Sequence, residues 1–328
     1  MYKMILENVK IGILGGSRFV DMLVSYATEL GWQVAVMDKN PQATCARYPS
    51  VFHTGDPLSY ENVIEFGKGV DILTVERKDV DVAALRRLRD NGVRIYPSPE
   101  IMDIIQDKFL QKRLLERNGI PVVSGSWVAG RHELSVIVSR SERGVVECYD
   151  PVPMVFNGKR LLLDFQTCLA DIGTDEAMQA CNLAIKTAEA IGLTGAMTVQ
   201  MLVDENGKMY VNDLAPRPRY SRRNAIKTSE HLPLRQQQMR LILGLPAGAV
   251  QQDSVSVMIN ILEPAAYRKH IITEALKTIL CTSDVQEYWH KKDSRYKSDP
   301  AGNITMPECM IESTEAKAVM IQYLLMNE

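Results

Sequence analysis

A chain of 328 residues is long enough for two or three packed units, and 46% apolar and 24% charged residues are ordinary for a globular protein. Its 38 basic residues are balanced by 40 acidic ones, which leaves no basic excess for binding nucleic-acid phosphates. The sequence has no apolar run near the roughly 20 residues that span a bilayer, and charges interrupt residues 1–16, unlike a signal peptide. We therefore expect a cytoplasmic protein with neither nucleic-acid nor membrane partners.

The first hundred residues alternate short apolar strands with helical patterns. Strands are expected at Val9–Leu14, Gln33–Met37, Val51–Thr54, Ile72–Val75 and Val93–Tyr96. Helices are expected between them at Phe19–Leu30, Tyr60–Phe66 and Val82–Asp90. This alternation implies parallel pairing through right-handed crossovers. We predict an α/β protein whose residues 1–100 form a doubly wound parallel sheet, with functional loops at the strand C-termini.

The rest of the chain mixes helices and strands without strict alternation, which predicts an α+β central domain over residues 101–254. The expected helices are Ile101–Asn118, Thr174–Ile191 and Leu234–Leu243. The expected strands are Glu133–Ser139, Met154–Phe156, Leu161–Phe165, and a hairpin of Ala196–Val203 with Lys208–Asn212. Residues 255–328 are predicted to form a small strand-rich domain that ends in a helix at Ser313–Leu325.

The cysteines and histidines give no metal or redox signature. The six cysteines are Cys45, Cys148, Cys168, Cys181, Cys281 and Cys309. None of them has CxxC spacing, so we expect free thiols in a reducing cytosol. The five histidines show no metal-ligand spacing either.

A glycine turn after the first strand has the form of an anion site. Gly15, Gly16 and Ser17 join that strand to a helix N-terminus, where backbone N–H groups and the helix dipole favour phosphate or carboxylate. Asp38 ends the second strand, where a dinucleotide-binding fold places its ribose ligand. However, the adjacent glycines do not match GxGxxG, which argues against nicotinamide binding. A tight turn that only packs the helix on the strand is the remaining alternative.

Six segments in the same order resemble N5-carboxyaminoimidazole ribonucleotide synthetase, an ATP-grasp ligase of purine synthesis. They are Ile11–Ser17, Val93–Pro99, Ile105–Pro121, Glu133–Val138, Val211–Pro218 and Leu243–Ala247. The resemblance implies a pre-ATP-grasp domain, a central domain that clamps ATP and a small C-terminal domain. Enzymes of this family join bicarbonate to aminoimidazole ribonucleotide with ATP, through carboxyphosphate.

The resemblance also implies roles for individual residues. Lys108 and Glu133 match family residues on the nucleotide side, and Asn212 precedes Asp213, which stands where the family has a magnesium-binding glutamate. Arg217 matches a substrate-side arginine. Lys292 and Arg295 resemble the start of the motif that grips the ribonucleotide phosphate.

Other family features are missing from the sequence. Between Pro121 and Glu133 the family carries an ATP-clamping subdomain, on the order of 50 residues at typical element lengths. Only Val122–His132 stand there in this chain. Gln200 replaces the first magnesium-binding glutamate, and Asp213 is a shortened version of the second. We therefore expect a truncated ATP-grasp domain in which these nucleotide and metal residues are vestigial.

Three functional hypotheses follow from this comparison. The favoured one is a degenerate relative without ligase activity, a homodimer that binds a small phosphorylated ligand and needs no cofactor. Its candidate ligand-binding residues are Gly15, Gly16, Ser17, Glu76, Arg217, Lys292 and Arg295. An active synthetase, which would need ATP and magnesium, and a non-catalytic partner of another enzyme are the alternatives. The basic cluster formed by Arg217, Arg219, Arg222, Arg223 and Lys227 is either a solvated loop or an anion site.

Overall fold

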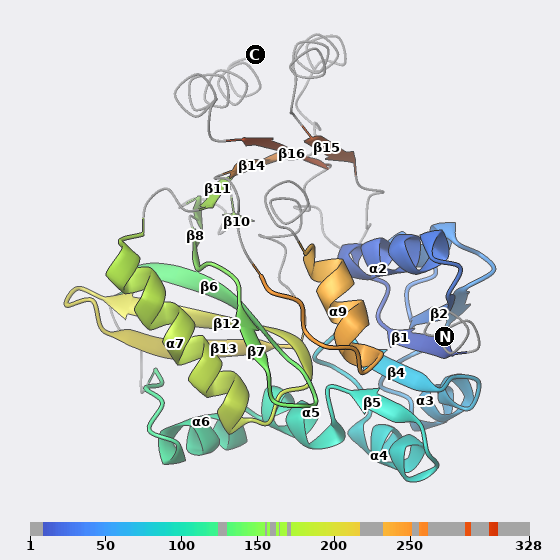
Figure 1. Ribbon diagram of the computed structural model, residues 1–328. Helices are drawn as coiled ribbons and strands as arrows, with labels where there is room; N and C mark the ends of the chain where they lie inside the picture. Colours follow the sequence, from blue (N-terminus) through green and yellow to red (C-terminus); the bar gives the residue numbers. More distant parts are fainter. Residues whose placement is uncertain are drawn as a thin grey trace, which may run out of the picture.

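The computed structural model describes residues 9–123, 130–154, 156–157, 162–163, 165–168, 172–216, 232–250, 256–261, 286–289 and 302–307. Figure 1 shows three main sheets along the chain, with helices packed against the first two. Within these ranges no helix is both long and apolar enough to cross a membrane.

The N-terminal sheet is parallel and has the strand order β3-β2-β1-β4-β5. Its strands are β1 (Lys10–Leu14), β2 (Gln33–Asp38), β3 (Phe52–Thr54), β4 (Ile72–Val75) and β5 (Arg94–Tyr96). They are connected by α2 (Arg18–Glu29), η1 (Thr44–Arg47), α3 (Tyr60–Gly67) and α4 (Val82–Asp90). The predicted doubly wound sheet is confirmed, and the order of the strands reverses between β1 and β4.

Alternate residues of β1 face opposite layers, as strand geometry requires. Ile11 and Ile13 belong to the apolar cluster that contains the buried face of α2. Leu14 belongs to the cluster that contains residues of α3 and α4. Each of these helices starts at a residue whose side-chain oxygen accepts from the first turn: Ser17 for α2, Ser59 for α3 and Asp81 for α4.

The helix predicted over Ile101–Asn118 is two helices, α5 (Pro99–Gln106) and α6 (Lys108–Arg117). They are separated at Asp107, which has an extended backbone with φ −102° and ψ 105°. Its carboxylate accepts from the N–H groups of Phe109 at 2.8 Å and Leu110 at 3.1 Å. A new N-cap therefore interrupts an otherwise continuous helical pattern.

The central sheet is antiparallel, with the order β13-β12-β6-β7 and β8 beside β6. Its strands are β6 (Gly130–Arg140), β7 (Val146–Cys148), β8 (Val152–Met154), β12 (Gly195–Asp204) and β13 (Met209–Ala215). The predicted hairpin is β12–β13, whereas β7 was not predicted. α7 (Thr174–Ala190) packs against β6, β7 and β12, and α9 (Leu234–Ile242) joins this sheet to α2.

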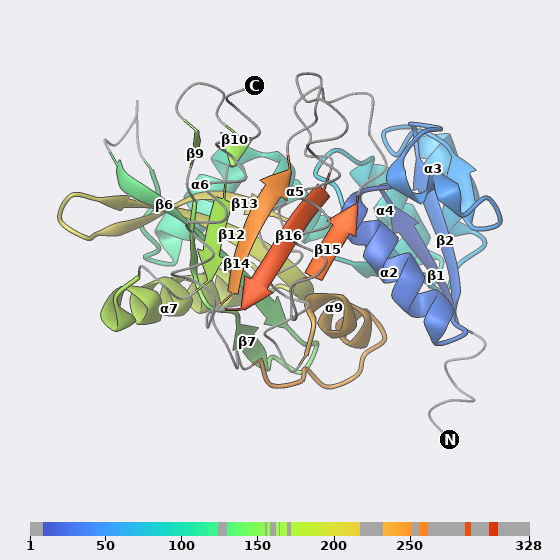
Figure 2. The same cartoon turned by 90° about the horizontal axis from the view of Figure 1, so that it is seen from above.

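The remaining strands form an antiparallel sheet in the order β11-β14-β16-β15, seen across the centre of Figure 2. They are β11 (Phe165–Cys168), β14 (Ser256–Ile261), β15 (Gln286–Trp289) and β16 (Gly302–Pro307). A short pair, β9 (Phe156–Asn157) and β10 (Leu162–Leu163), precedes β11. The helix predicted at Ser313–Leu325 lies outside the described residues.

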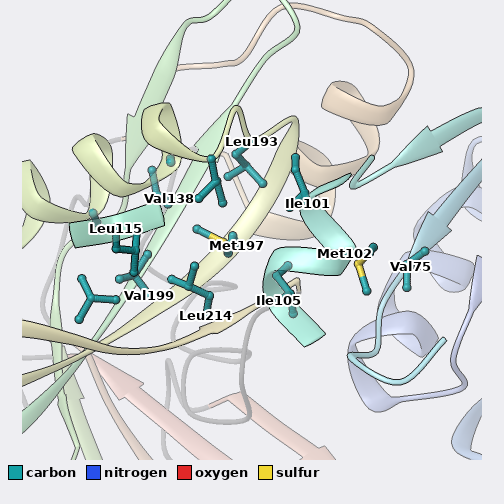
Figure 3. Close-up of a cluster of buried hydrophobic side chains, with 14 of the residues drawn as sticks. Val75, Ile101, Met102, Ile105, Leu115, Val138, Leu193, Met197, Val199 and Leu214 are labelled. Atoms are coloured by element: carbon teal, nitrogen blue, oxygen red, sulfur yellow. The ribbon is translucent and has the colours of Figure 1, made fainter. Parts of the chain in front are cut away.

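The buried core joins the first two sheets. Figure 3 shows α5 with Ile101, Met102 and Ile105 between Val75 of β4 and the central-sheet residues Val138, Met197 and Leu214. Met102 is completely buried. α5 therefore fixes the position of the N-terminal sheet against the central sheet, and the candidate site lies where the two meet.

Candidate functional site

The glycine turn lies at the point where the strand order of the parallel sheet reverses. Gly15 and Gly16 follow β1, and Glu76 follows the neighbouring strand β4. The Glu76 N–H donates to the carbonyl oxygen of Leu14 at 3.0 Å, which continues the ladder between the two strand ends. Open α/β sheets bind ligands at this position. The structure thus brings together four of the predicted ligand-binding residues, Gly15, Gly16, Ser17 and Glu76.

The anion position of this turn is filled by the protein itself. The Gly16 N–H donates to Asp38 Oδ2 at 2.7 Å, and the Asn40 N–H donates to Asp38 Oδ1 at 2.9 Å. Arg77 Nη1 lies 3.9 Å from the same Oδ2 atom. Asp38 is therefore a structural anion at the turn, and its place at the end of β2 serves this contact.

A backbone conformation at Gly15 and a lack of space at Gly16 explain why the turn needs glycine. Gly15 has φ +114°, a backbone conformation that residues with a Cβ rarely adopt. A Cβ on Gly16 would lie 2.7 Å from the Cβ of Ala43 and 3.2 Å from that of Asp38. The glycine pair is thus required both for the turn and for the approach of Asp38.

Glu76 is fully buried and is linked to the central sheet by Gln238 of α9. Gln238 Nε2 donates to Glu76 Oε1 at 3.1 Å, while Gln238 Oε1 accepts from the Ala196 N–H of β12 at 2.9 Å. One amide side chain therefore holds a loop of the first sheet to a strand of the second.

A run of three residues, Gln106, Asp107 and Lys108, organises the next part of the site. Gln106 Nε2 donates to the carbonyl oxygens of Lys78 at 2.8 Å and Val80 at 2.9 Å, which fixes the loop after β4. Asp107 starts α6. Lys108, at the first position of α6, reaches a carboxylate on β13.

That carboxylate is Asp213, which contacts two lysine ammonium groups. Lys78 Nζ lies 2.6 Å from Asp213 Oδ1 and 2.8 Å from Oδ2, and Lys108 Nζ also contacts Oδ1. The side chain of Asp213 is 12% exposed, against 33% for Lys78 and 57% for Lys108. Two positive charges therefore meet one negative charge between the loop after β4, the start of α6 and β13.

The lysines control the ionisation of Asp213. Burial by itself would raise the pKa of this carboxyl group, because it disfavours the charged form. The hydrogen bonds and charges of Lys108 and Lys78 outweigh burial and hold the pKa below its ordinary value. Asp213 is consequently ionised and paired over the neutral pH range.

The other predicted nucleotide and metal positions lie on the strands of the central sheet. Gln200 of β12 is opposite Asp213 in the β12–β13 register and is buried. Glu133 of β6 is opposite Leu202 of β12, and Asn212 is an exposed residue of β13. Within the described ranges, no group of three His, Cys, Asp or Glu side chains could hold a metal ion.

Three predicted ligand-binding residues, Arg217, Lys292 and Arg295, lie outside the described residues, as does the rest of the basic cluster. Sequence reasoning also missed functional contacts that the structure supplies. Lys78 is 135 residues from Asp213 in the sequence. Gln106 is 28 residues from Lys78 and 26 from Val80, and Gln238 is 42 residues from Ala196 and 162 from Glu76. The available signal for Lys78 was its place just after the expected strand Ile72–Val75, since functional loops follow the C-termini of parallel strands.

The connection between α6 and β6 is short and starts and ends at the same sheet. Val122 forms a bridge with Val211 of β13, and the Val123 N–H donates to the Val211 carbonyl oxygen at 3.3 Å. β6 begins at Gly130 and runs beside β12. Residues 124–129 alone separate these two parts of the central domain.

Family models match most of this architecture. Residues 8–106 match the ribonucleotide synthetase preATP-grasp domain, and residues 104–231 match the ATP-grasp domain. The chain is an ATP-grasp protein of the ribonucleotide synthetase type. The similarity to solved structures agrees with this assignment. The N5-carboxyaminoimidazole ribonucleotide synthetase of Thermotoga maritima superimposes with a TM-score of 0.83 at 25% identity, covering 96% of this chain and 98% of its own.

A second structure and two curated relatives extend the similarity of this ribonucleotide-synthetase-type protein. The Aspergillus clavatus synthase complexed with ATP has the same fold, with a TM-score of 0.84 at 23% identity over 98% of this chain and 99% of that one. The Bacillus subtilis N5-carboxyaminoimidazole ribonucleotide synthase is 24% identical over 79% of this chain and 83% of its own length. The Saccharomyces cerevisiae phosphoribosylaminoimidazole carboxylase is 24% identical over 88% of this chain, which spans 62% of that enzyme.

Proposed function

We propose that this protein, related to enzymes of purine biosynthesis, does not perform ATP-dependent ligation and instead binds a small phosphorylated molecule without ATP or magnesium. The observation that carries the proposal is the pairing of Asp213 with Lys78 and Lys108. Magnesium requires charged oxygens in near-octahedral geometry. The Asp213 oxygens already accept from ammonium groups, and the adjacent Gln200 offers a neutral amide. This donor set does not fit the ion.

The short connection at residues 124–129 supports the same conclusion. Phosphoryl transfer from ATP depends on positioning and on stabilising charge around the transferred group. Six residues between two parts of one sheet leave no room for a further clamping subdomain there. The alignment with the Bacillus subtilis synthase is 318 positions long but includes only 79% of the 328 residues of this chain. Several tens of residues of that synthase therefore have no equivalent residue in this chain.

The charge at the site favours an anionic ligand. Lys78 and Lys108 together exceed the single charge of Asp213, and both lysines are partly exposed. A phosphate that approaches Lys78 and Lys108 would encounter the positive charge of these two side chains. We place the protein in the cytoplasm, in line with its composition, and propose a homodimer, which light scattering in solution would test.

Isothermal titration with magnesium–ATP and with aminoimidazole ribonucleotide tests the proposal, alongside an assay of bicarbonate-dependent phosphate release. The Bacillus subtilis synthase, assayed in parallel, is the positive control. Binding of the ribonucleotide with neither ATP binding nor phosphate release supports the proposal. Tight ATP binding with bicarbonate-dependent phosphate release contradicts it and identifies an active synthetase, while binding of neither ligand contradicts it in favour of a non-catalytic partner of another enzyme.

A double variant distinguishes the two causes of inactivity. Gln200→Glu with Lys78→Ala restores one carboxylate and removes one competing ammonium. We expect this variant still to release no phosphate, because the connection at residues 124–129 is unchanged. If phosphate release appears, the short connection is not a barrier to catalysis.

A further inference from the structure

Two cysteines far apart in the sequence meet in the central domain. Cys148 ends β7, Cys181 lies in α7, and their Sγ atoms are 2.8 Å apart. Their contact joins β7 to α7, and both side chains also pack against the main apolar cluster. The expectation of thiols without a disulfide is confirmed for this pair, whereas the sequence spacing did not reveal that the two cysteines are in contact.

The pair is placed for chemistry rather than simply buried in the core. Both cysteines are thiols that form no disulfide and are partly exposed, whereas Cys45 is buried. Cys148 Sγ lies 3.4 Å and Cys181 Sγ 3.8 Å from the same acceptor, the carbonyl oxygen of Tyr149. The Tyr149 N–H is held by the Ile137 carbonyl oxygen of β6 at 2.9 Å. A fixed backbone atom thus orients both sulfur atoms toward each other.

We propose that Cys148 and Cys181 form a reversible disulfide when the protein meets a hydroperoxide. A disulfide has a sulfur–sulfur distance of about 2.05 Å, so the two atoms need to approach by less than roughly 1 Å. The proposal is independent of the function proposed above, since neither cysteine belongs to that site.

The reaction balances with a hydroperoxide as oxidant. One thiol loses its proton, and the thiolate sulfur attacks a peroxide oxygen, which breaks the O–O bond and gives a sulfenic acid. The leaving hydroxide takes up the released proton as water. The second sulfur then attacks the sulfenic sulfur, the S–S bond forms, the S–O bond breaks and a second water leaves. Hydrogen peroxide is reduced to two waters while two thiols become one disulfide, which cellular thiols reverse by exchange.

The full chain treated with hydrogen peroxide tests this inference. After the remaining thiols are alkylated, non-reducing peptide mapping should find Cys148 linked to Cys181 as the main cross-link, and dithiothreitol should remove it. Cys45 is the internal control and should remain a free thiol, because it is buried and its pKa is raised by burial. Alkylation of Cys148 and Cys181 to the same extent with and without peroxide, or their conversion to sulfinic acid, would overturn the proposal.

The thermal stability of the oxidised form gives a second measurement. The disulfide would connect residues 33 positions apart, and it should raise the Tm by roughly 5 °C over the reduced protein. Cys181→Ser should fold with nearly the Tm of the reduced protein and show no rise with peroxide. An equal rise in this variant would show that another reaction is responsible.

Discussion

At the scale of single residues, the surroundings of Asp213 show how the tertiary fold places one carboxylate beside two lysines that are distant from it in the sequence. Asp213 lies on β13 opposite Gln200 of β12, and the family resemblance matches Gln200 to the first and Asp213 to the second magnesium-binding glutamate. The ammonium groups of Lys78 and Lys108 make it a member of an ion pair. Motif comparison found Asp213 and Lys108, but it could not reveal their contact, because 105 residues separate them and only the tertiary fold brings them together.

Replacement of Asp213 by Asn should lower the free energy of unfolding at pH 7 by about 1–2 kcal/mol. This is less than expected for a fully buried ion pair, because both lysines are partly exposed. The folded-state pKa of Asp213 lies below its unfolded value. Its contribution is therefore complete above the unfolded pKa, near 4, and is lost as the pH falls through the lower folded value. Urea denaturation of both proteins at pH 7 and at pH 3 measures this.

The matched control is Glu65→Gln, which removes the exposed ion pair with Lys68 and should cost less than about 0.5 kcal/mol. If the difference between Asp213→Asn and the parent protein is the same at both pH values, the ion pair does not contribute to stability.

Gly16→Ala should destabilise the protein by about 1–3 kcal/mol, because its Cβ would meet Ala43 at 2.7 Å and press on Asp38. Gly69→Ala is the control, since its Cβ would have only an ordinary contact of 3.7 Å with the carbonyl oxygen of Phe66. Thermal unfolding followed by circular dichroism compares the two. Equal Tm values for both variants would show that the turn tolerates a side chain.

At the scale of elements, the sequence predicted the parts with strong periodicity and failed where a local contact overrides it. The alternation of β1 to β5 with their helices is visible in the sequence, and the β12–β13 hairpin follows from its turn. The pattern from Ile101 to Asn118 gave one helix, because the apolar spacing continues through the break between α5 and α6. Asp107 before Lys108 was the available signal, since aspartate is a preferred N-cap. The short strand β7 had no comparable signal, because it is only three residues long.

Asp107→Ala should therefore cost about 1 kcal/mol, because the N–H groups of Phe109 and Leu110 lose their acceptor at the start of α6. It should also loosen Lys108, so hydrogen exchange should become faster over α6 than over α7. Exchange measured by mass spectrometry on peptides from both helices tests this, and a uniform increase in both would contradict a local capping role.

Gln238→Ala should cost about 2–3 kcal/mol, because it removes a donor to buried Glu76 and leaves the Ala196 N–H without its acceptor. Gln236→Ala, on the same helix, should change the free energy of unfolding by less than about 0.5 kcal/mol. Chemical denaturation of both variants provides the comparison. A similar effect of the two substitutions would mean that the link between α9 and Glu76 is unimportant.

At the scale of the whole molecule, the N-terminal and central sheets share one apolar core. The same cluster contains Val75 of β4, Met102 of α5 and Met197 of β12. Contacts of this kind couple the unfolding of the parts that they join. The pre-ATP-grasp and ATP-grasp regions are thus separate as family domains but joined in their packing.

Met102→Ala should cost about 2–5 kcal/mol and should destabilise both sheets together, because the cavity opens between them. Hydrogen exchange in increasing urea should give equal midpoints for peptides of β1 and β12, and the variant should shift both equally. Met178→Ala is the control, since this side chain is 58% exposed. A shift confined to one sheet would mean that the two unfold independently.

The carboxylate at the glycine turn has a consequence for any molecule that comes to the meeting point of the two sheets. Asp38 belongs to the same chain as the Gly16 N–H that it accepts from. It therefore competes with any free anion for that N–H group at an effective concentration in the millimolar range or above. A free inorganic anion of ordinary affinity would rarely win this competition. A ligand that displaces Asp38 must therefore make further contacts with the protein. Otherwise it must bind to Lys78 and Lys108 and leave the hydrogen bond between Asp38 and Gly16 intact.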